Sequence, residues 1–180
     1  MNQNAESAAT LDGRRELPVA VVMAEVIRGE TWGGWPVGVV AGGRFAAAEP
    51  SRTLMREGPD GRQWLWQGFR LRLRPQDAGD YALNLGSDRP TVFVVCKRVA
   101  DGELRPLSTT VSLAEAQDLD APELRDHSEQ VYRVAMPGEV YHWVEHFVLD
   151  HYQPRRRKGK RRRRNAEYDD VEQRADRAPR

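Results

Sequence analysis

The chain has 180 residues, 39% of them hydrophobic, which is enough for one ordinary domain with a buried core. Its single cysteine, Cys96, excludes a disulfide within the chain, and the early apolar stretch "VAVVMAEVI" is too short to span a bilayer and contains Glu25. We therefore expect a protein of a reducing compartment, located in the cytoplasm and without a membrane span.

The formal net charge of +1 hides an uneven distribution of charge. The run "RRRKGKRRRR" over residues 155–164 carries nine positive charges, and the residues after it carry a net charge of −2. Residues 1–154 therefore carry −6, so an acidic body is joined to a basic tail. Residues 1–16 and 153–180 have little apolar character, and we expect both ends to be disordered around one globular domain over 17–152.

The first part of this domain reads mainly as strands. The Val-rich segment from Pro18 to Ile27 predicts a first strand, "RGETWGGW" predicts a turn or loop, and "WPVGVVAG" predicts a second strand. Residues 42–62 are rich in Gly, Ala and Pro, which predicts a loop with at most a short strand near Leu54.

The segment "QWLWQGFRLRLR" predicts a strand with an irregularity at Gly68. Trp64 and Trp66 share one face of a regular strand, but the apolar residues after the glycine fall on the other face. Such a change of phase at a glycine predicts a bulge or bend. The apolar residues after it are Phe69, Leu71 and Leu73, and the residues expected to face outward are Arg70, Arg72 and Arg74.

The next segments continue the strand pattern. "PQDAGD" predicts a turn, and "YALNL" and "TVFVVCKRV" predict strands, of which the second is continuously apolar and therefore expected to be central. "ADG" predicts a hairpin into "ELRPLSTTV". Ser112 and Glu115 have the spacing of a capping box for a short helix, "LAEAQDL", and a further strand is expected around residues 130–135.

Pro137 suits the first position of the most strongly amphipathic helix in the chain. Apolar residues then recur at helical spacing, together with His151 near the end. We predict an α+β domain, in which a mainly antiparallel sheet of about six strands, open or barrel-like, is covered by this C-terminal helix. The stripe is Val140, Trp143, Val144, Phe147, Val148 and His151.

The stretch "HWVEH" within this helix matches the H-x-x-E-H pattern of one class of zinc peptidases. At about 100° per residue, His142 and His146 fall on the side opposite the apolar stripe. We therefore interpret them as solvated residues that form at most a weak surface metal site, and we expect neither a catalytic metal nor a cofactor.

The sequence contains no Gly-rich phosphate loop, no C-x-x-C pair and no nucleophile elbow, so it identifies no catalytic residues and favours a non-enzyme. Two features are typical of binding. Four tryptophans are candidates for contact with a protein partner, or for stacking on single-stranded nucleic acid beside the outward arginines, although packing within the domain is the simpler reading. They are Trp32, Trp35, Trp64 and Trp66.

The second binding feature is the basic run 155–164, together with the outward arginines, and it would bind phosphates, anionic lipid headgroups or an acidic protein surface. A solvated tail without a ligand is the alternative. The anion-binding candidates are Arg70, Arg72, Arg74, Arg155, Arg156, Arg157, Lys158, Lys160, Arg161, Arg162, Arg163 and Arg164.

Four stretches together resemble an uncharacterised proteobacterial family of small proteins. They are "PVAVVMAEVIRGETWGGWPVGVVAG", "YALNLGSDRPTVFVVCKR", "TVSLAEAQDLDAPE" and "VYRVAMPGEVYHWVEHFVLDHYQPRRRKGKRRRR", which together lie within residues 18–164. The genes of that family commonly lie beside those for molybdenum- or tungsten-dependent formate dehydrogenase, its iron–sulfur subunits and its chaperones.

The resemblance implies an accessory or assembly role around formate dehydrogenase, with its subunits or chaperones as protein partners. Binding of RNA or single-stranded nucleic acid through the basic tail is an alternative. A further alternative is an enzyme whose site the sequence does not reveal, and this includes the processing of a molybdopterin cofactor, as some relatives are labelled.

Overall fold

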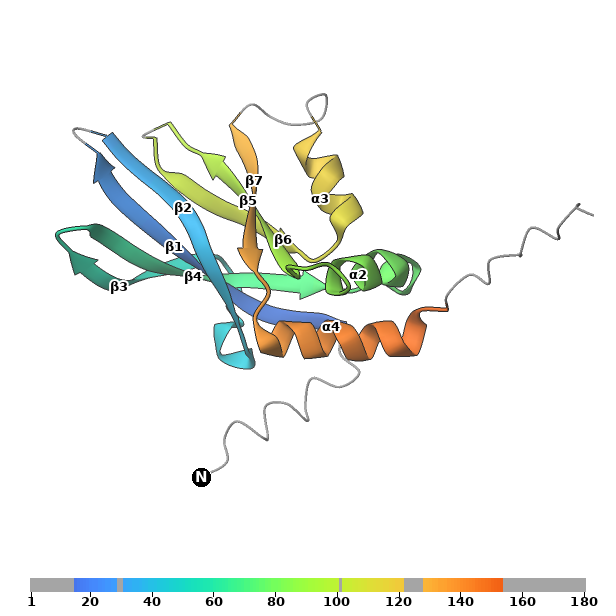
Figure 1. Cartoon of the computed structure of the whole chain (residues 1–180). Coiled ribbons are helices and arrows are strands. Elements are labelled where there is room, and N and C mark those ends of the chain that lie inside the picture. Colours follow the sequence, from blue (N-terminus) through green and yellow to red (C-terminus); the bar gives the residue numbers. More distant parts are fainter. Residues whose placement is uncertain (1–14, 29–30, 101, 122–127, 154–180) are drawn as a thin grey trace, which may run out of the picture.

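The computed structural model describes residues 15–28, 31–100, 102–121 and 128–153, and their strands form two antiparallel sheets (Figure 1). Sheet A has the order β2-β1-β4-β3, and sheet B has the order β6-β5-β7. The strands are β1 (Glu16–Arg28), β2 (Thr31–Ala41), β3 (Ser51–Gly58), β4 (Gly61–Arg72), β5 (Thr91–Arg98), β6 (Leu104–Thr110) and β7 (Glu129–Ala135).

The helices lie at the margins of the two sheets. Helices α2 and α4 run side by side at one end of the molecule, and α3 lies against sheet B beside β7 (Figure 1). The helical segments are η1 (Gly43–Phe45), η2 (Pro75–Asp77), α2 (Ala78–Leu85), α3 (Leu113–Asp120) and α4 (Gly138–His151). None of the helices in the described part of the chain is long and apolar enough to cross a membrane.

The core lies between the facing sides of the two sheets and under α4. Alternate residues of β1 point inward, and they are buried together with the continuous apolar run of β5 and four residues of the α4 stripe. From β1 these are Leu17, Val19, Val21 and Met23, from β5 Val92, Val94 and Cys96, and from α4 Val140, Trp143, Val144 and Phe147.

The prediction of an α+β domain with antiparallel strands is confirmed, and β5 is central in sheet B as expected. The barrel-like form is not supported, because the strands pair into two separate sheets. Helix α4 is confirmed, but Pro137 is its N-cap, with extended backbone, and not its first helical residue.

The segment "YALNL", predicted as a strand, belongs to helix α2, which follows the short η2 turn at the predicted turn "PQDAGD". Its buried side chains recur every three residues, at Ala78, Tyr81 and Asn84. Tyr81 packs edge-on against Phe147 of α4, with ring centroids 6.1 Å apart. Contacts with a distant helix therefore select the helical form of a segment whose local pattern alternates.

Two strands are longer than the sequence predicts. The segment from Ser51 to Gly58, predicted as loop with at most a short strand near Leu54, is the complete strand β3. All its residues are exposed, so no apolar alternation marks it. The expected loop "RGETWGGW" lies partly in β2, because Gly33 and Gly34 pair with Val26 and Glu25 of β1.

The irregularity at Gly68 is confirmed. Gly68 has φ of +94°, and the register between β1 and β4 shifts between Val19 and Val21. A Cβ at this position would lie 2.8 Å from the carbonyl oxygen of Glu49, so a side chain does not fit without movement. Beyond this bulge Phe69 turns toward the core in the same sense as Trp66 before it.

The N-terminus of α3 is capped as Ser112 predicts, because its Oγ accepts from Glu115 N at 3.0 Å. In a capping box the Glu115 carboxylate would accept directly from Ser112 N; here the hydroxyl of Thr110 lies between them. Ser112 N donates to Thr110 Oγ1 at 3.1 Å, and Thr110 Oγ1 donates to the Glu115 carboxylate at 2.7 Å. The carboxylate of Asp80 in α2 also accepts from Ala114 N at 3.3 Å, which joins the two helices.

The expected disordered ends, with the basic run 155–164, lie outside the described residues except for residues 15–16 and 153. Strand β1 begins at Glu16, one residue before the predicted start of the globular domain.

Candidate functional site

The candidate tryptophans lie on both faces of sheet A. Trp64 and Trp66 are opposite Met23 and Val21 of β1, so they point to the inner face, where they are partly buried against the core. Trp35 is opposite Ala24 and points to the outer face with 36% of its surface exposed. Trp32 of β2 is opposite Ile27 of β1, and the side chain of Trp32 is not among those that the structure describes. The structure therefore does not bring Trp35 onto one surface with Trp64 and Trp66.

The inner pair of tryptophans holds an arginine of β3. Cζ of Arg52 lies 4.5 Å from the ring centroid of Trp64 and 5.6 Å from that of Trp66. The Arg52 guanidinium also pairs with Glu103, whose other carboxylate oxygen is 2.6 Å from Nε of Arg105. We call Arg52, Trp64, Trp66, Glu103 and Arg105 the arginine–tryptophan cluster.

This cluster joins the two sheets. Glu103 and Arg105 lie at the start of β6 in sheet B, whereas Arg52 and Trp64 belong to sheet A. Nε1 of Trp64 also donates to the Glu25 carboxylate at 2.7 Å. Because these groups are paired with one another within the chain, the cluster stabilises the contact between the sheets.

The outer face of sheet A is crossed by the segment between β2 and β3. These two strands are opposite edges of the sheet, so residues 42–50 must pass over β1 and β4. Phe45 of this segment and Ala20 of β1 are both buried but lie outside the core cluster. This places Ala20 under the crossing segment, on the outer face, with Phe45 packed on the same side. Arg44 lies over the Phe45 ring, with Cζ 4.7 Å from its centroid.

Beyond this crossing the outer face carries several apolar side chains, next to the polar Thr53 and Gln63, which are opposite Leu65 and Ala24. The pairing places Val22 opposite Leu65, and Ala24 opposite Trp35, on the face away from the core. Val37 and Met55, at the register shifts of the two edge strands, are 46% and 55% exposed. We call Val22, Ala24, Trp35, Val37, Met55 and Leu65 the outer apolar face.

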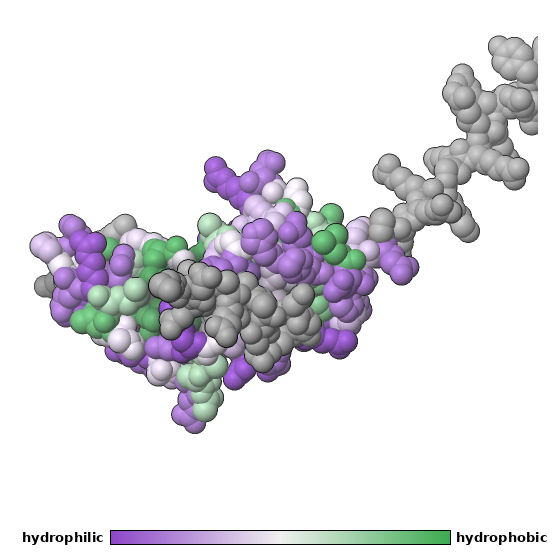
Figure 2. Space-filling model, turned by 90° about the horizontal axis from the view of Figure 1, so that it is seen from below, coloured by the Kyte–Doolittle hydropathy of each residue, from purple (hydrophilic) through white to green (hydrophobic). Residues whose placement is uncertain are grey.

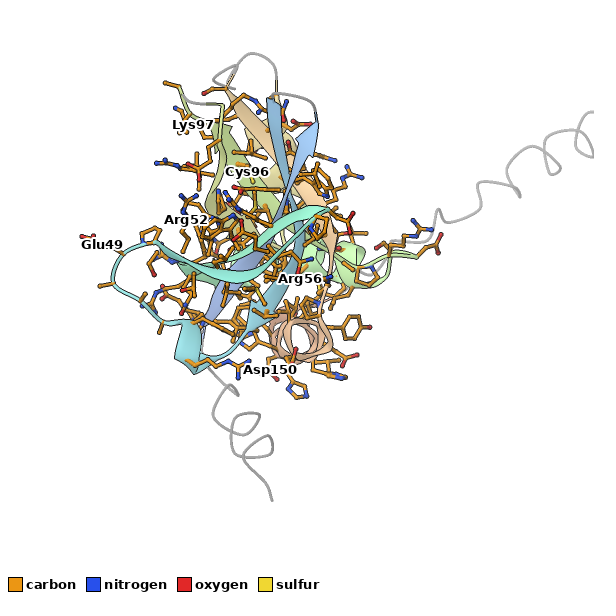
Figure 3. All side chains as sticks on the ribbon, turned by 90° about the vertical axis from the view of Figure 1, so that its left-hand side faces the viewer. Glu49, Arg52, Arg56, Cys96, Lys97 and Asp150 are labelled. Carbon is orange, nitrogen blue, oxygen red and sulfur yellow. The ribbon has the colours of Figure 1, made fainter. Side chains whose placement is uncertain are left out.

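The outer apolar face spans all four strands of sheet A and carries no charged side chain among its members. From below, apolar side chains are visible among polar ones at the end of the molecule formed by β3 and the tips of β1 and β2 (Figure 2). The nearest outward cation on β3 is Arg56, which is opposite Gln63. Arg52 and Arg56 lie on different sides of the β3 ribbon (Figure 3).

The outward arginines of β4 lie on the far side of the crossing segment. Both Arg70 and Arg72 are exposed and share Glu16, with N–O distances of 3.9 and 3.0 Å. Arg74 donates its backbone N–H to the hydroxyl of buried Tyr81 at 3.1 Å. The other nine candidate cations, at 155–164, lie outside the described residues.

The histidines of "HWVEH" have the predicted register. His142 and His146 are exposed, whereas Trp143, Val144 and Phe147 are buried. Nδ1 of His142 lies 3.5 Å from the Glu145 carboxylate. No group of three or more His, Cys, Asp or Glu side chains able to hold a metal ion occurs in the described part of the chain. His151, which the sequence places on the apolar stripe, is exposed, but its ring stacks on that of Phe147 with 4.1 Å between the centroids.

The side chains of Cys96 and Asn84 are buried within the domain. Burial raises the pKa of the Cys96 thiol from 9.0 to about 12, so this cysteine is protonated at neutral pH. Asn84 is 1% exposed, and its side chain bonds to the backbone of Thr91 and Val111. No local pattern predicts this role, because an asparagine in an apparent strand of alternating residues is not distinguishable from a surface residue.

A family model matches most of the chain, including the whole region of the two sheets beyond residue 17. The model of one family, described as a protein of unknown function (DUF3305), matches residues 18–163. No curated protein and no solved structure matches the chain. Since the family model covers the strands of both sheets and all of α4, the chain belongs to the DUF3305 family.

Proposed function

We propose that this protein is a non-catalytic accessory or assembly protein that binds a protein partner through the outer apolar face. The basic run 155–164 is a second contact in this proposal. The partner is formate dehydrogenase or one of its chaperones, a choice supported by the resemblance of four stretches of the chain to a family encoded beside those genes.

The outer apolar face is the observation that carries this proposal. Apolar side chains that span four strands and are partly or fully exposed on one face mark protein interaction sites more often than scattered surface residues do. Trp35 stands at one edge of this face, and aromatic residues are enriched where partners bind. The arginine–tryptophan cluster, in contrast, is already paired within the chain.

Co-purification tests the proposal. The tagged full-length chain is expressed in cells that produce the dehydrogenase, and the bound subunits and chaperones are quantified by mass spectrometry. Val37→Asp places a charge in the outer apolar face, on the edge strand β2, at a site that is already open to water. Leu149→Asp is the matched control, because Leu149 is 75% exposed on α4, away from sheet A.

We expect Val37→Asp to reduce the recovered partner at least about tenfold, because it introduces an unpaired charge into the interface, and Leu149→Asp to leave it unchanged. A chain ending at Gln153 should retain part of the binding and lose its dependence on salt. Absence of dehydrogenase subunits and chaperones from the wild-type sample, or equal loss in both variants, would count against the proposal.

Binding of nucleic acid is a second candidate, favoured by the exposed guanidinium groups of Arg70 and Arg72 on the outer side of β4. Glu16 pairs with both of them and weakens their potential, so the run 155–164 would supply most of the affinity. A filter-binding titration of single-stranded RNA against salt, with and without residues 154–180, separates the two candidates. Failure of the full-length chain to bind at low salt excludes this one.

A further inference from the structure

The exposed edge of β3 differs from the other strand edges in the described part of the molecule. β3 ends sheet A, and its backbone hydrogen bonds there go to β4 alone. The other edge strands are packed against neighbours, since β2 lies beside β7, and β6 beside β4. All residues of β3 are exposed, so nothing described covers the N–H and C=O groups that point away from β4.

The side chains of β3 determine which kind of strand can pair with its free edge. Leu54 lies on the inner face and is 41% exposed, opposite Trp64. The register shift between Leu54 and Arg56 turns Met55 and Arg56 toward the outer face together. A strand added at this edge therefore meets an apolar side chain on one face, and an apolar side chain with a cation on the other.

The charges of β3 select the occupant. Arg52 pairs with Glu103, and Glu57 accepts from Nε of Arg62 at 2.7 Å. Arg56 has no ion pair with any described residue, so its guanidinium is the charge that a partner must neutralise. A second copy of this chain would bring only Glu57 on its own β3, and that carboxylate is already held.

We propose that β3 binds an extended segment of a protein partner as a fifth strand of sheet A, with a carboxylate of that segment paired to Arg56. This rests on the proposed function only in taking the partner to be a protein. Backbone hydrogen bonds supply affinity in this mode of recognition, and alternate side chains supply specificity. The added strand also extends the outer apolar face past Met55.

A synthetic peptide tests this without the natural partner. The probe is a blocked peptide of the length of β3 in which valine alternates with glutamate, so that one face is apolar beside Leu54 and the other is acidic beside Arg56. The comparison peptide alternates valine with lysine. Binding to the full-length chain is measured by fluorescence anisotropy, and exchange of the amides of residues 51–58 is measured by NMR with and without peptide.

We expect the acidic peptide to bind, and to slow exchange of those β3 amides that exchange rapidly in the free protein. Arg56→Glu should weaken it about tenfold, as for loss of a hydrogen bond to a charged group. Arg89→Glu, which changes another exposed arginine, should stay within about twofold of wild type.

Three results of the peptide assays would overturn the inference. They are no saturable binding, equal binding of both peptides, and binding that leaves exchange of residues 51–58 unchanged. Size-exclusion chromatography is run in parallel, and a dimer with β3 amides protected before peptide is added would also overturn it. The peptide assay contains no dehydrogenase, so a negative result there does not contradict the proposed accessory role. A negative co-purification result, in turn, does not contradict strand addition at the edge of β3.

Discussion

Asn84 and Thr91 exchange two hydrogen bonds, one in each direction. Nδ2 of Asn84 donates to Thr91 O at 2.8 Å, and Thr91 N donates to Oδ1 of Asn84 at 3.0 Å. The same Nδ2 also donates to Val111 O at 2.7 Å. One buried amide thus ties α2 to the start of β5 and to the residue that follows β6.

We expect Asn84→Ala to lower the free energy of unfolding by about 3 kcal/mol, because it leaves backbone groups of Thr91 and Val111 buried without partners. Urea denaturation followed by circular dichroism measures this. Ser87→Ala is the control, since Ser87 is exposed and its side chain makes a single bond, to Asn84 O, and it should cost about 1 kcal/mol or less. Equal costs for the two variants would contradict the role of Asn84.

The two sides of α4 should respond differently to truncation. Trp143→Ala removes a large side chain that is 6% exposed, and we expect it to cost about 3–5 kcal/mol. The double variant His142→Ala with His146→Ala changes exposed positions and should cost less than about 1 kcal/mol. Urea midpoints decide between these values, and the reverse ranking would refute the packing of this helix.

The arginine–tryptophan cluster predicts an optical signal. Arg52→Ala uncovers the rings of Trp64 and Trp66, so their fluorescence emission should shift to longer wavelength, and stability should fall by about 1 kcal/mol. Arg70→Ala removes a guanidinium that is likewise near a carboxylate but not over a described tryptophan ring, and its emission spectrum should match wild type. A spectral shift in both variants would show that the effect is general loosening.

Burial of Cys96 predicts a dependence of stability on pH. Its folded pKa of about 12 lies above the ordinary value of 9.0, so the folded state holds the proton more tightly. The contribution of the thiol is therefore complete below pH 9 and is lost as pH rises toward about 12.

Urea midpoints at about pH 7 and about pH 10 measure this effect against Cys96→Ala, which lacks the group. Wild type should lose more stability across this interval than the variant does. Burial also raises the pKa of Tyr81 and of Tyr132, so the variant keeps a dependence of its own. Identical slopes for the two proteins, or rapid labelling of the thiol by a disulfide reagent without denaturant, would exclude the buried position.

Local pattern was sufficient where one element determines its own form. The apolar run of β5, the capping residue Ser112, the stripe of α4 and the change of phase at Gly68 all predict what the structure has. Local pattern failed for β3, because all of its residues are exposed and no alternation of buried and exposed positions marks the strand. It also failed for α2, whose helical form depends on contacts with Phe147 and Thr91 later in the chain.

The candidate surface was only partly predictable for the same reason. Trp35 was identified, but its separation from Trp64 and Trp66 follows from the strand order β2-β1-β4-β3, which no local pattern contains. Val22, Val37 and Met55 gave no signal, because they become neighbours only when four strands pair and two of them are bulged.

Sheet A is formed entirely from residues 16–72, and sheet B from residues 91–135. During synthesis the whole of sheet A therefore leaves the ribosome before any strand of sheet B. Until β6 and α4 emerge, the inner face with Met23, Trp64 and Leu71 has nothing to pack against. The nascent chain then carries apolar surface on both sides of one sheet, and this interval is when it most needs a chaperone.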